Sequence, residues 1–492
     1  MKKYLLLAIT GLAFNAVQAQ NQNLPDALLY AQTDLGGTAR FRAMSGAFGA
    51  LGGDFSSLNI NPAGGAVFTT SQIAVTLNND SRSNKSNYFG TATKEDKNSF
   101  DLGQIAAVWV FENYNSDSGW NKFSIGANYE NRGNFDNRFY SQGHNPTNSI
   151  SSYFLDFANN PIGNTNYNQL NYGIEQTNLG YEGYVINQAT DPAGNSIYTA
   201  NTPNGGNYYQ ENFVNSTGYN GKLTFNIATQ YKDKFYFGLN LNSHFTDYTR
   251  KSSFYEDYLD TPGTQTALQR VRFDNELYRY GNGFSFQVGA IAKVTNSLRA
   301  GLAYESPTWY NFTEDVRQTI SSNLTNAYGY DTGILTYPDY RLQTPGKYTG
   351  SLAYVFGKIG LISLDYAMKD YSNTKYGTDF NNTNFSALNN DIETLLDATS
   401  EVRIGAETRV KQWSFRAGYR FEQSPYKNGK TVGDLNSFSG GLGYNFGPVR
   451  ADASYAYAKR DSQMPFFATG LNNPANIKSV SNSVALTLLF EM

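Results

Sequence analysis

Short segments in which apolar and polar side chains alternate recur along most of the chain. Successive side chains of a β-strand point to opposite faces of the sheet, so strict alternation gives a strand one apolar face. The clearest case is the last segment, which ends with the chain and whose apolar face consists of Val484, Leu486, Leu488, Phe490 and Met492. This pattern predicts a strand over 480–492 with one side facing an apolar environment.

The segment 413–421 repeats this pattern but carries charges on its second face. Trp413, Phe415 and Tyr419 lie on one face, whereas Arg416 and Arg420 lie on the other. A charge on the lipid-facing surface of a membrane barrel costs ~2–4 kcal/mol near the midplane. If this strand crosses a membrane, both arginines must therefore face the inside of a closed sheet.

Fourteen such strands are expected, three before residue 222 and eleven after it. They lie at 71–77, 102–111, 122–131, 222–231, 235–247, 283–294, 298–305, 347–356, 359–369, 401–410, 413–421, 437–446, 449–459 and 480–492. Connections alternate between short turns, such as 232–234 and 295–297, and long polar stretches, such as 248–282 and 306–346. A soluble β-sandwich gives no reason for this alternation, whereas membrane barrels have short periplasmic turns and long extracellular loops. The pattern predicts an all-β fold, a transmembrane antiparallel β-barrel of about 14 strands over 71–492, in a bacterial outer membrane.

The composition supports an exported membrane barrel and excludes several kinds of chemical site. The 492 residues include 38 Tyr and 33 Phe, and the mean hydropathy of -0.50 is too polar for a helical membrane protein. The absence of Cys excludes disulfides, thiolate metal sites and a lipid-anchored lipoprotein. The net charge of -3, which becomes -5 once Lys2 and Lys3 are removed, gives no indication of a nucleic-acid partner.

Residues 1–19 read as a secretory signal peptide. Lys2 and Lys3 precede an apolar stretch at 4–14, and Ala19 ends a small-residue cleavage site, so the mature chain is expected to begin at Gln20. The alternative, a first transmembrane helix, is disfavoured because the apolar run is well short of the ~20 residues needed to cross a bilayer.

Residues 34–66 differ in kind from the alternating segments. Glycine is too frequent there for stable strand pairing, with Gly36, Gly37, Gly46, Gly49, Gly52, Gly53, Gly64 and Gly65 among small side chains. Irregular backbone at membrane depth is tolerated only inside protein or a water-lined cavity. We therefore expect residues 20–70 to form an N-terminal extension and a hatch inside the barrel lumen.

Several motifs resemble the FadL/TodX family of outer-membrane transporters for long-chain fatty acids and other hydrophobic compounds. The proposed hatch residues Gly46, Gly49, Asp54, Asn61, Pro62 and Ala63 fall in stretches similar to that family's N-terminal hatch. Further similar patches occur, in the family's order, at 283–286, 301–307, 364–366 and 416–425. The resemblance implies a fourteen-stranded barrel closed by the hatch, which takes up hydrophobic small molecules by passive diffusion and releases them sideways at a kinked third strand.

The candidate sites for such transport lie in the loops and the third strand. Loop 132–221 contains a helical pattern that is expected to present an apolar face to a ligand or to pack on the barrel rim, formed by Ile150, Tyr153, Phe154 and Phe157. A second helical pattern, Ile392, Leu395 and Leu396, has the same two interpretations. Gly126 and Gly133 mark either a kink for lateral exit or ordinary relief of strand twist.

The sequence contains no motif that indicates catalysis or the binding of a metal or cofactor. His144 and His244 are far apart without a nearby carboxylate cluster, and no GxSxG-like motif stands out. We expect no enzyme activity, no cofactor and no metal; the expected partners are a hydrophobic ligand and outer-membrane lipid. An alternative function is a structural or docking subunit of a larger outer-membrane secretion or assembly complex with other outer-membrane proteins, because the Asn- and Tyr-rich loops are polar for a capture site.

Overall fold

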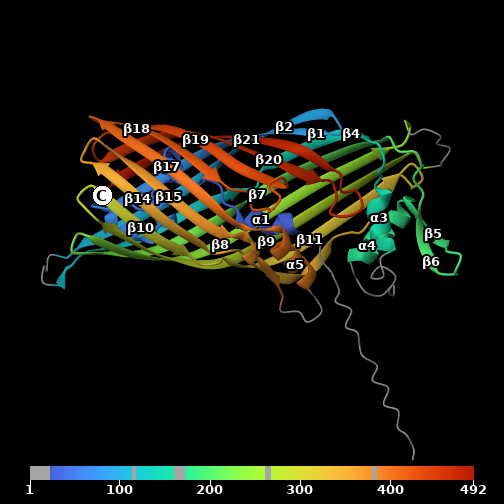
Figure 1. Cartoon of the computed structure of the whole chain (residues 1–492), viewed down its shortest axis with the longest axis horizontal. Coiled ribbons are helices and arrows are strands. Elements are labelled where there is room, and N and C mark those ends of the chain that lie inside the picture. The colour runs from blue at the N-terminus through green and yellow to red at the C-terminus, as the bar shows by residue number, and fades with distance from the viewer. Residues whose placement is uncertain (1–22, 114–117, 160–171, 261–267, 379–384) are drawn as a thin grey trace, which may run out of the picture.

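The computed structural model describes residues 23–113, 118–159, 172–260, 268–378 and 385–492. The predicted signal peptide, residues 1–19, lies outside the described residues. Antiparallel neighbours close the sheet into a barrel, because the first strand pairs with the last (Figure 1). The fourteen wall strands, in order, are β1 (Gln72–Tyr88), β2 (Thr91–Glu112), β3 (Trp120–Asn134), β7 (Tyr208–Tyr231), β8 (Phe235–Asp257), β9 (Arg270–Lys293), β10 (Leu298–Glu305), β14 (Lys347–Phe356), β15 (Gly360–Asp370), β17 (Ala398–Val410), β18 (Trp413–Glu422), β19 (Val432–Asn445), β20 (Val449–Pro465) and β21 (Pro474–Glu491). Each contains, or overlaps almost wholly with, one predicted strand, so the predicted fold class is confirmed.

Several wall strands continue well beyond the predicted ends. On β8, the outward residues from Phe235 to Leu241 are apolar and exposed, and Phe245 ends this band. Further along, Asp247 and Lys251 take the outward positions, although the hydrogen-bonded ladder to β9 continues to Asp257. Eleven residues from 235 to 245 are about the length that crosses a bilayer as a tilted strand. The remainder of β8 therefore stands outside the membrane.

The polar stretch 78–101, expected to separate the first two strands, is itself a hairpin. β1 and β2 pair from Gln72 to Tyr88 across a two-residue turn at Phe89 and Gly90, both of which have positive φ. Such a turn matches the twist of paired strands. Alternation in hydropathy ends where the strand leaves lipid, but the backbone pairing does not.

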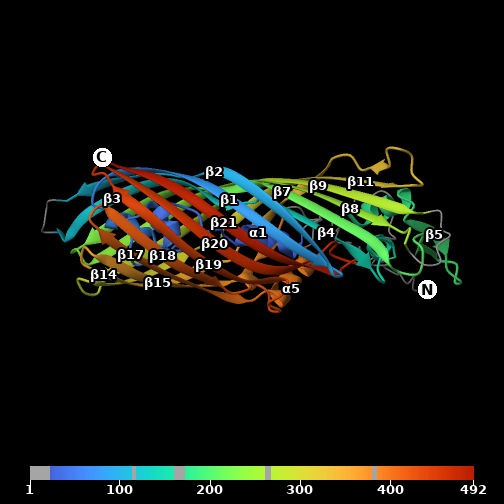
Figure 2. The same cartoon turned by 90° about the horizontal axis from the view of Figure 1, so that it is seen from above.

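The two rims of the barrel differ, as predicted. One rim has short turns, and the chain ends there, where the backbone N–H of Met492 donates to the carbonyl of Ser71 (2.9 Å). The opposite rim carries the remaining elements. These are β4 (Asn137–Asn145), α3 (Ser151–Ala158), α4 (Tyr172–Glu182), β5 (Ile186–Thr190), β6 (Ser196–Ala200), β11 (Trp309–Ser322), β12 (Tyr330–Asp331), β13 (Leu335–Gln343), η4 (Tyr371–Asn373), β16 (Lys375–Gly377) and α5 (Ser386–Leu395). Figure 2 shows the long tilted strands with β1 beside β21.

Residues 23–67, here called the N-terminal segment, run inside the barrel wall. They form α1 (Leu24–Ala31), α2 (Ala39–Ala43), η1 (Phe55–Asn59) and η2 (Pro62–Val67). α2 packs on β18 to β21, whereas η2 packs on β3 and β7 to β9, so the segment reaches across the bore (Figure 1). Within the described residues, no helix is long and apolar enough to cross a membrane.

Candidate functional site

The N-terminal segment keeps its shape because a polar side chain caps each of its short helices. The capping residues are Asn23, Thr38, Asp54 and Asn61, each accepting a backbone N–H two or three residues ahead. Such caps satisfy N–H groups that a helix start leaves without partners. Pro62 occupies the first position of η2, where its missing N–H costs nothing. Two of the predicted hatch residues, Asp54 and Asn61, are therefore needed for the local fold.

Asn61 also ties the segment to the wall. Its buried amide Nδ2 donates to the carbonyl oxygens of Gly49 (2.8 Å), Ala290 (3.0 Å) and Leu302 (3.3 Å). The latter two belong to β9 and β10. One buried side chain thus joins two parts of the segment to two wall strands, and a fully satisfied polar contact of this kind favours a single arrangement.

The wall approaches the segment closely at Gly49. The carboxylate of Asp365, on β15, accepts the backbone N–H groups of Phe48 and Gly49, both at 3.0 Å. A Cβ added at position 49 would lie 2.0 Å from Oγ of Ser351 on β14. Gly49 is therefore required by the contact itself, because a larger residue would separate the segment from the wall.

The wall provides a matching glycine, which gives a direct test. A Cβ at Gly301 would lie 2.3 Å from the carbonyl oxygen of Gly49, whereas the nearest atom to a Cβ at Gly350, on the neighbouring strand, is 3.9 Å away. We expect Gly301→Ala to destabilise the folded barrel by about 1–3 kcal/mol, since overpacking forces the backbone to shift. Gly350→Ala is the matched control. Urea unfolding in detergent measures both, and equal midpoints would contradict this contact.

An ion-pair cluster centred on Glu407 connects α2 to the wall. The fully buried carboxylate lies 2.8 Å from Nε of Arg40, 2.6 Å from Nε of Arg416 and 2.6 Å from Nη2 of Arg409. Arg416 also contacts Asp452 (2.7 Å) on β20. Arg416 faces inward, as the alternation predicted. Removal of one partner from such a buried cluster leaves an uncompensated charge, which typically costs ~3–5 kcal/mol.

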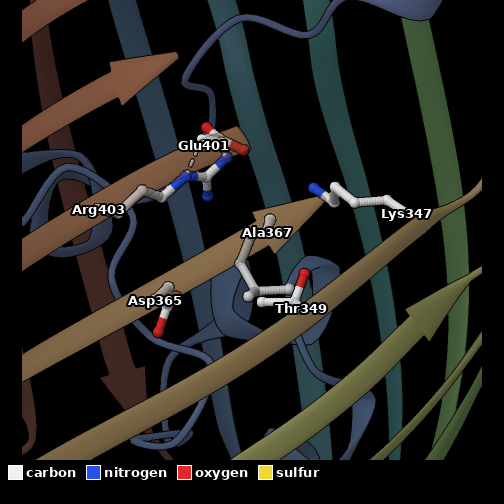
Figure 3. A pocket seen from close by; sticks show the side chains of 7 residues that line it. Lys347, Thr349, Asp365, Ala367, Glu401 and Arg403 are labelled. Atoms are coloured by element: carbon white, nitrogen blue, oxygen red, sulfur yellow. Dashed lines mark hydrogen bonds and ion pairs between the residues drawn. The ribbon is translucent and has the colours of Figure 1, made fainter. Parts of the chain in front are cut away.

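A second ion-pair cluster fills the bore beside the first. Glu401 contacts both Arg403 and Arg420, at 2.6 Å each, so Arg420 also faces inward as predicted. Figure 3 shows the side chains of Lys347 and Asp365 directed into the same space from β14 and β15. The cavity left between them has a volume of only about 10 Å³, which is room for about one water. Charged side chains therefore occupy most of the space between β14, β15 and β17 at this point.

Helix α1 lies midway along the barrel in an aromatic cluster (Figure 1). The ring of Tyr30 packs against Phe312 (4.6 Å between ring centroids), Phe135 (5.6 Å) and Tyr310 (5.6 Å). Leu28 of the same helix is buried in this cluster. The chain's own helix therefore occupies an apolar site inside the bore.

A buried carboxylate fixes α1 in this aromatic site. Asp26 contacts Arg279 (3.0 Å) and Arg250 (3.2 Å), and Arg279 also contacts Glu314 (2.9 Å). These partners come from β8, β9 and β11. Tyr30 of α1 therefore has aromatic partners on β11, and the charged Asp26 has partners on β8 and β9.

Strand β3 leaves its neighbour β2 before its end. Their ladder runs from Glu112↔Lys122 to Gln104↔Glu130, and among the described residues no ladder joins β2 residues 91–103 to β3 or β4. Over the same length β2 remains paired with β1 on its other side. Side chains bridge the opening instead: Nδ2 of Asn134 donates to Oγ of Ser99 (2.7 Å). The wall therefore has an interruption closed by side chains rather than by backbone.

The two glycines proposed for a kink have different surroundings. Gly133 lies where the register of β3 against β7 shifts, just before β3 ends at Asn134. Gly126 lies in a regular ladder, and a Cβ there would sit 3.5 Å from Leu58 of the N-terminal segment. The register shift is therefore at Gly133, while Gly126 faces the segment, and a kink for lateral exit stays a prediction.

The helix predicted in loop 132–221 is α3, at the long-loop rim. Ile150, Tyr153 and Phe154 are buried, and Phe157 is partly buried in the same cluster. They pack against rim residues such as Phe273. The second predicted helix is α5, where Ile392 and Leu396 are buried but Leu395 is exposed. Both helices pack on the rim in this structure; contact with a ligand remains a proposal.

Glu256 holds α3 to the barrel from beyond the apolar band. Its fully buried carboxylate accepts the N–H of Ile150 (3.0 Å), Nε2 of Gln210 (2.6 Å), the hydroxyl of Tyr258 (2.6 Å) and the hydroxyl of Ser149. Burial raises the pKa of Glu256 to about 7, and the hydrogen bonds only partly oppose this.

We expect the attachment of α3 to depend on pH. Because the pKa of Glu256 is higher in the folded rim than in an unfolded chain, the stabilisation is complete below the unfolded value near 4.5 and declines as pH rises through 7. Hydrogen exchange of residues 151–158, corrected for its intrinsic pH dependence, should accelerate severalfold from pH 5 to pH 8. Glu256→Gln should abolish this dependence, whereas Glu211→Gln, at the same rim, should keep it. An identical slope in both variants would refute the role of Glu256.

The two histidines lie in different parts of the barrel. His244 is buried, with Nε2 2.9 Å from Oγ of Ser285 and Nδ1 3.4 Å from the hydroxyl of Tyr310. His144 lies at the long-loop rim beside Tyr209. In the part of the chain that the structure describes, no group of three or more His, Asp and Glu residues could hold a metal ion.

An apolar outer band, unequal rims and an N-terminal segment lying inside the wall define a β-barrel of the outer-membrane type. A family model described as outer membrane protein transport protein (OMPP1/FadL/TodX) matches residues 217–466, just over half of the chain. The chain belongs to this family. It is an outer-membrane transport barrel for hydrophobic compounds, in a family of transport proteins rather than enzymes.

Solved structures share the fold along nearly the whole chain. A Pseudomonas aeruginosa FadL homologue is 13% identical with a TM-score of 0.59, and 93% of this chain covers 99% of that one. The P. putida toluene transporter TodX is 12% identical with a TM-score of 0.54, and 93% of this chain covers 99% of that one. The CymD monoaromatic hydrocarbon channel is 14% identical with a TM-score of 0.51, and 93% of this chain covers 98% of that one. No curated protein matches the chain by sequence.

The charged clusters were missed by the sequence reasoning, apart from Arg416 and Arg420. Glu407 and Arg40 are separated by 367 residues, and no local pattern links them. The one local indication of this cluster was the position of Glu407 on the inward face of an alternating strand.

Proposed function

We propose that this barrel takes up hydrophobic small molecules, such as long-chain fatty acids or aromatic hydrocarbons, by passive diffusion. The observation that carries the proposal is the aromatic site occupied by α1. A ligand with a similar apolar surface competes for that site, and each buried CH₂ contributes ~0.8 kcal/mol without any specific polar contact. The names of the TodX and CymD structures, a toluene transporter and a monoaromatic hydrocarbon channel, support this class of substrate.

In this proposal the N-terminal segment is a hatch whose displacement opens the route. A ligand enters between the elements of the long-loop rim, near α3, and replaces α1 among the aromatic rings. It then leaves sideways through the opening between β2 and β3, where side-chain contacts can yield without breaking a backbone ladder. An apolar molecule leaving there passes directly into lipid and avoids water. This mechanism requires neither a nucleotide nor a metal.

An uptake assay tests the function. Proteoliposomes containing the barrel should accumulate a fluorescent long-chain fatty acid or toluene markedly faster than vesicles without protein, and a hydrophilic dye of similar size should enter no faster. The detergent-purified protein should also carry lipid or ligand by mass spectrometry. Stoichiometric partner proteins, an empty bore and no uptake would favour the docking-subunit alternative.

A further inference from the structure

A cavity with a volume of about 440 Å³ lies at the short-turn rim, below the end of the N-terminal segment. Its wall comes from strand ends next to the short turns and includes Lys122, Gln230, Tyr236, Lys293 and Arg299. The volume lies within the ~300–1,000 Å³ typical of small-molecule sites. It is far larger than the gap between the ion-pair clusters deeper in the bore.

Three cations share this cavity, and none of them is in ion-pair contact with a carboxylate among the described residues. Lys122, Lys293 and Arg299 form no ion pair with any carboxylate among the described residues. Arg40 and Arg416, deeper in the bore, each contact a carboxylate within 2.8 Å. Lys222 and Lys369, also directed into the bore, likewise donate to neutral oxygens, of Asn59 and Ala31. The cavity differs because it gathers three cations without an ion pair around one open volume.

Neutral groups hold two of these cations in position. Nζ of Lys122 donates to the carbonyl of Phe68 (2.6 Å), and Nη1 of Arg299 donates to the carbonyl of Leu51 (3.0 Å). Nε of Arg299 has no hydrogen-bond partner among the described residues. Neutral groups, rather than ion pairs, therefore hold these two cations in position.

The surroundings of the third cation give the cavity an apolar wall. Nζ of Lys293 lies 5.3 Å from the ring centroid of Tyr236, and Val67 lines the cavity too. Glu112 and Asp233 also line it, but Asp233 accepts a hydrogen bond from Gln230 rather than from a cation. Three cations against two carboxylates leave a net positive cavity, and a cleft of one sign concentrates ligands of the other.

We propose that the short-turn mouth of the barrel is a binding site for the oxyanion group of a small organic acid, a carboxylate or a phosphate. Lys122, Lys293 and Arg299 supply the charge, and the guanidinium and ammonium groups are the donors that such oxyanions bind best. Tyr236 and Val67 contact the organic part of the ligand. The site faces the periplasm and does not depend on the proposed uptake route.

Binding to the full-length protein in nonionic detergent tests the site, with hexanoate as the probe and uncharged 1-hexanol as its match in chain length. Hexanoate should show saturable binding by calorimetry and by saturation-transfer NMR, and 1-hexanol should not compete. Lys293→Gln should weaken hexanoate binding about tenfold, the effect of losing ~1.4 kcal/mol. Lys358→Gln, at a short turn of the same rim, is the matched control and should bind as the unmodified protein does.

Competition between hexanoate and inorganic phosphate distinguishes a site for any oxyanion from a site for carboxylates with an organic tail. Competition by phosphate means that the site reads charge alone, whereas binding of hexanoate without phosphate competition assigns it to carboxylates with an organic tail. Heat-modifiable gel mobility reports whether each variant is folded, and Lys122→Gln provides a second variant. Hexanoate affinity unchanged in both folded variants, or equal binding of 1-hexanol, would overturn the proposal.

Discussion

Deletion of residues 34–66 should open the barrel to small hydrophilic dyes. This segment provides Arg40, which pairs with Glu407, and Asn61, which binds carbonyls of β9 and β10. Without it, the aligned inward charges of the wall face water instead of protein. We expect dye entry into proteoliposomes to rise roughly tenfold or more, since a fourteen-stranded wall without its filling encloses solvent.

A point substitution separates loss of the plug from loss of the fold. Glu407→Gln keeps the chain length but leaves Arg40 and Arg416 without their shared carboxylate, so dye entry should rise by a smaller factor. Glu276→Gln, which removes one half of an exposed pair with Lys251, is the control because exposed pairs contribute little. Gel mobility shows whether each barrel is closed. A folded deletion variant with unchanged dye entry would contradict a plug.

A cross-link over the opening between β2 and β3 should abolish uptake of a hydrophobic probe. Ser99 and Asn134 are in hydrogen-bond contact across this opening, and the chain has no Cys of its own. Ser99→Cys together with Asn134→Cys, joined by a short reducible thiol cross-linker, should fix the two strands. We expect uptake of the fluorescent fatty acid to fall to the level of protein-free vesicles and to return on reduction, because the proposed lateral route is closed.

The control is a cross-link that joins strands already paired. Ser81 and Asn98 face each other in the β1–β2 ladder, so Ser81→Cys with Asn98→Cys should leave uptake unchanged. Single-Cys variants treated with the same reagent control for added bulk. Full uptake by the cross-linked Ser99 and Asn134 pair would exclude this exit and leave an axial route through the short-turn mouth.

The order and position of the wall strands could be read from the sequence because the outer face meets one uniform environment. Lipid requires an apolar side chain at every second position regardless of what lies elsewhere in the chain, so the signal in 413–421 or 480–492 is local. The inward position of Arg416 and Arg420 follows from the same argument. The hatch residues Asp54, Asn61 and Pro62 also carried a local signal, since each begins a helical turn.

Strand ends outside the membrane could not be read in this way. Along 78–101 and 248–257 the outward side chains meet water instead of lipid, and several buried inward ones, such as Asn84 and Glu256, are polar. Hydropathy therefore no longer alternates, and backbone pairing with the neighbouring strand defines the structure. The resulting errors lie at the long-loop side of the barrel, where the predicted loops are largely hairpins.

The sequence by itself therefore determined the barrel, its fourteen strands and, for 413–421 and 480–492, the side of the strand that faces lipid. Only the tertiary structure decided how the bore is filled: that Glu407 pairs with Arg40, that α1 lies among aromatic rings, and that Lys293 forms no ion pair with a carboxylate in the described parts of the chain. The physical reason is that the outward side chains all contact lipid, whereas each inward side chain contacts a different set of protein groups. Each is stabilised by a particular partner that can be hundreds of residues away, and such pairing leaves no periodic pattern in the chain.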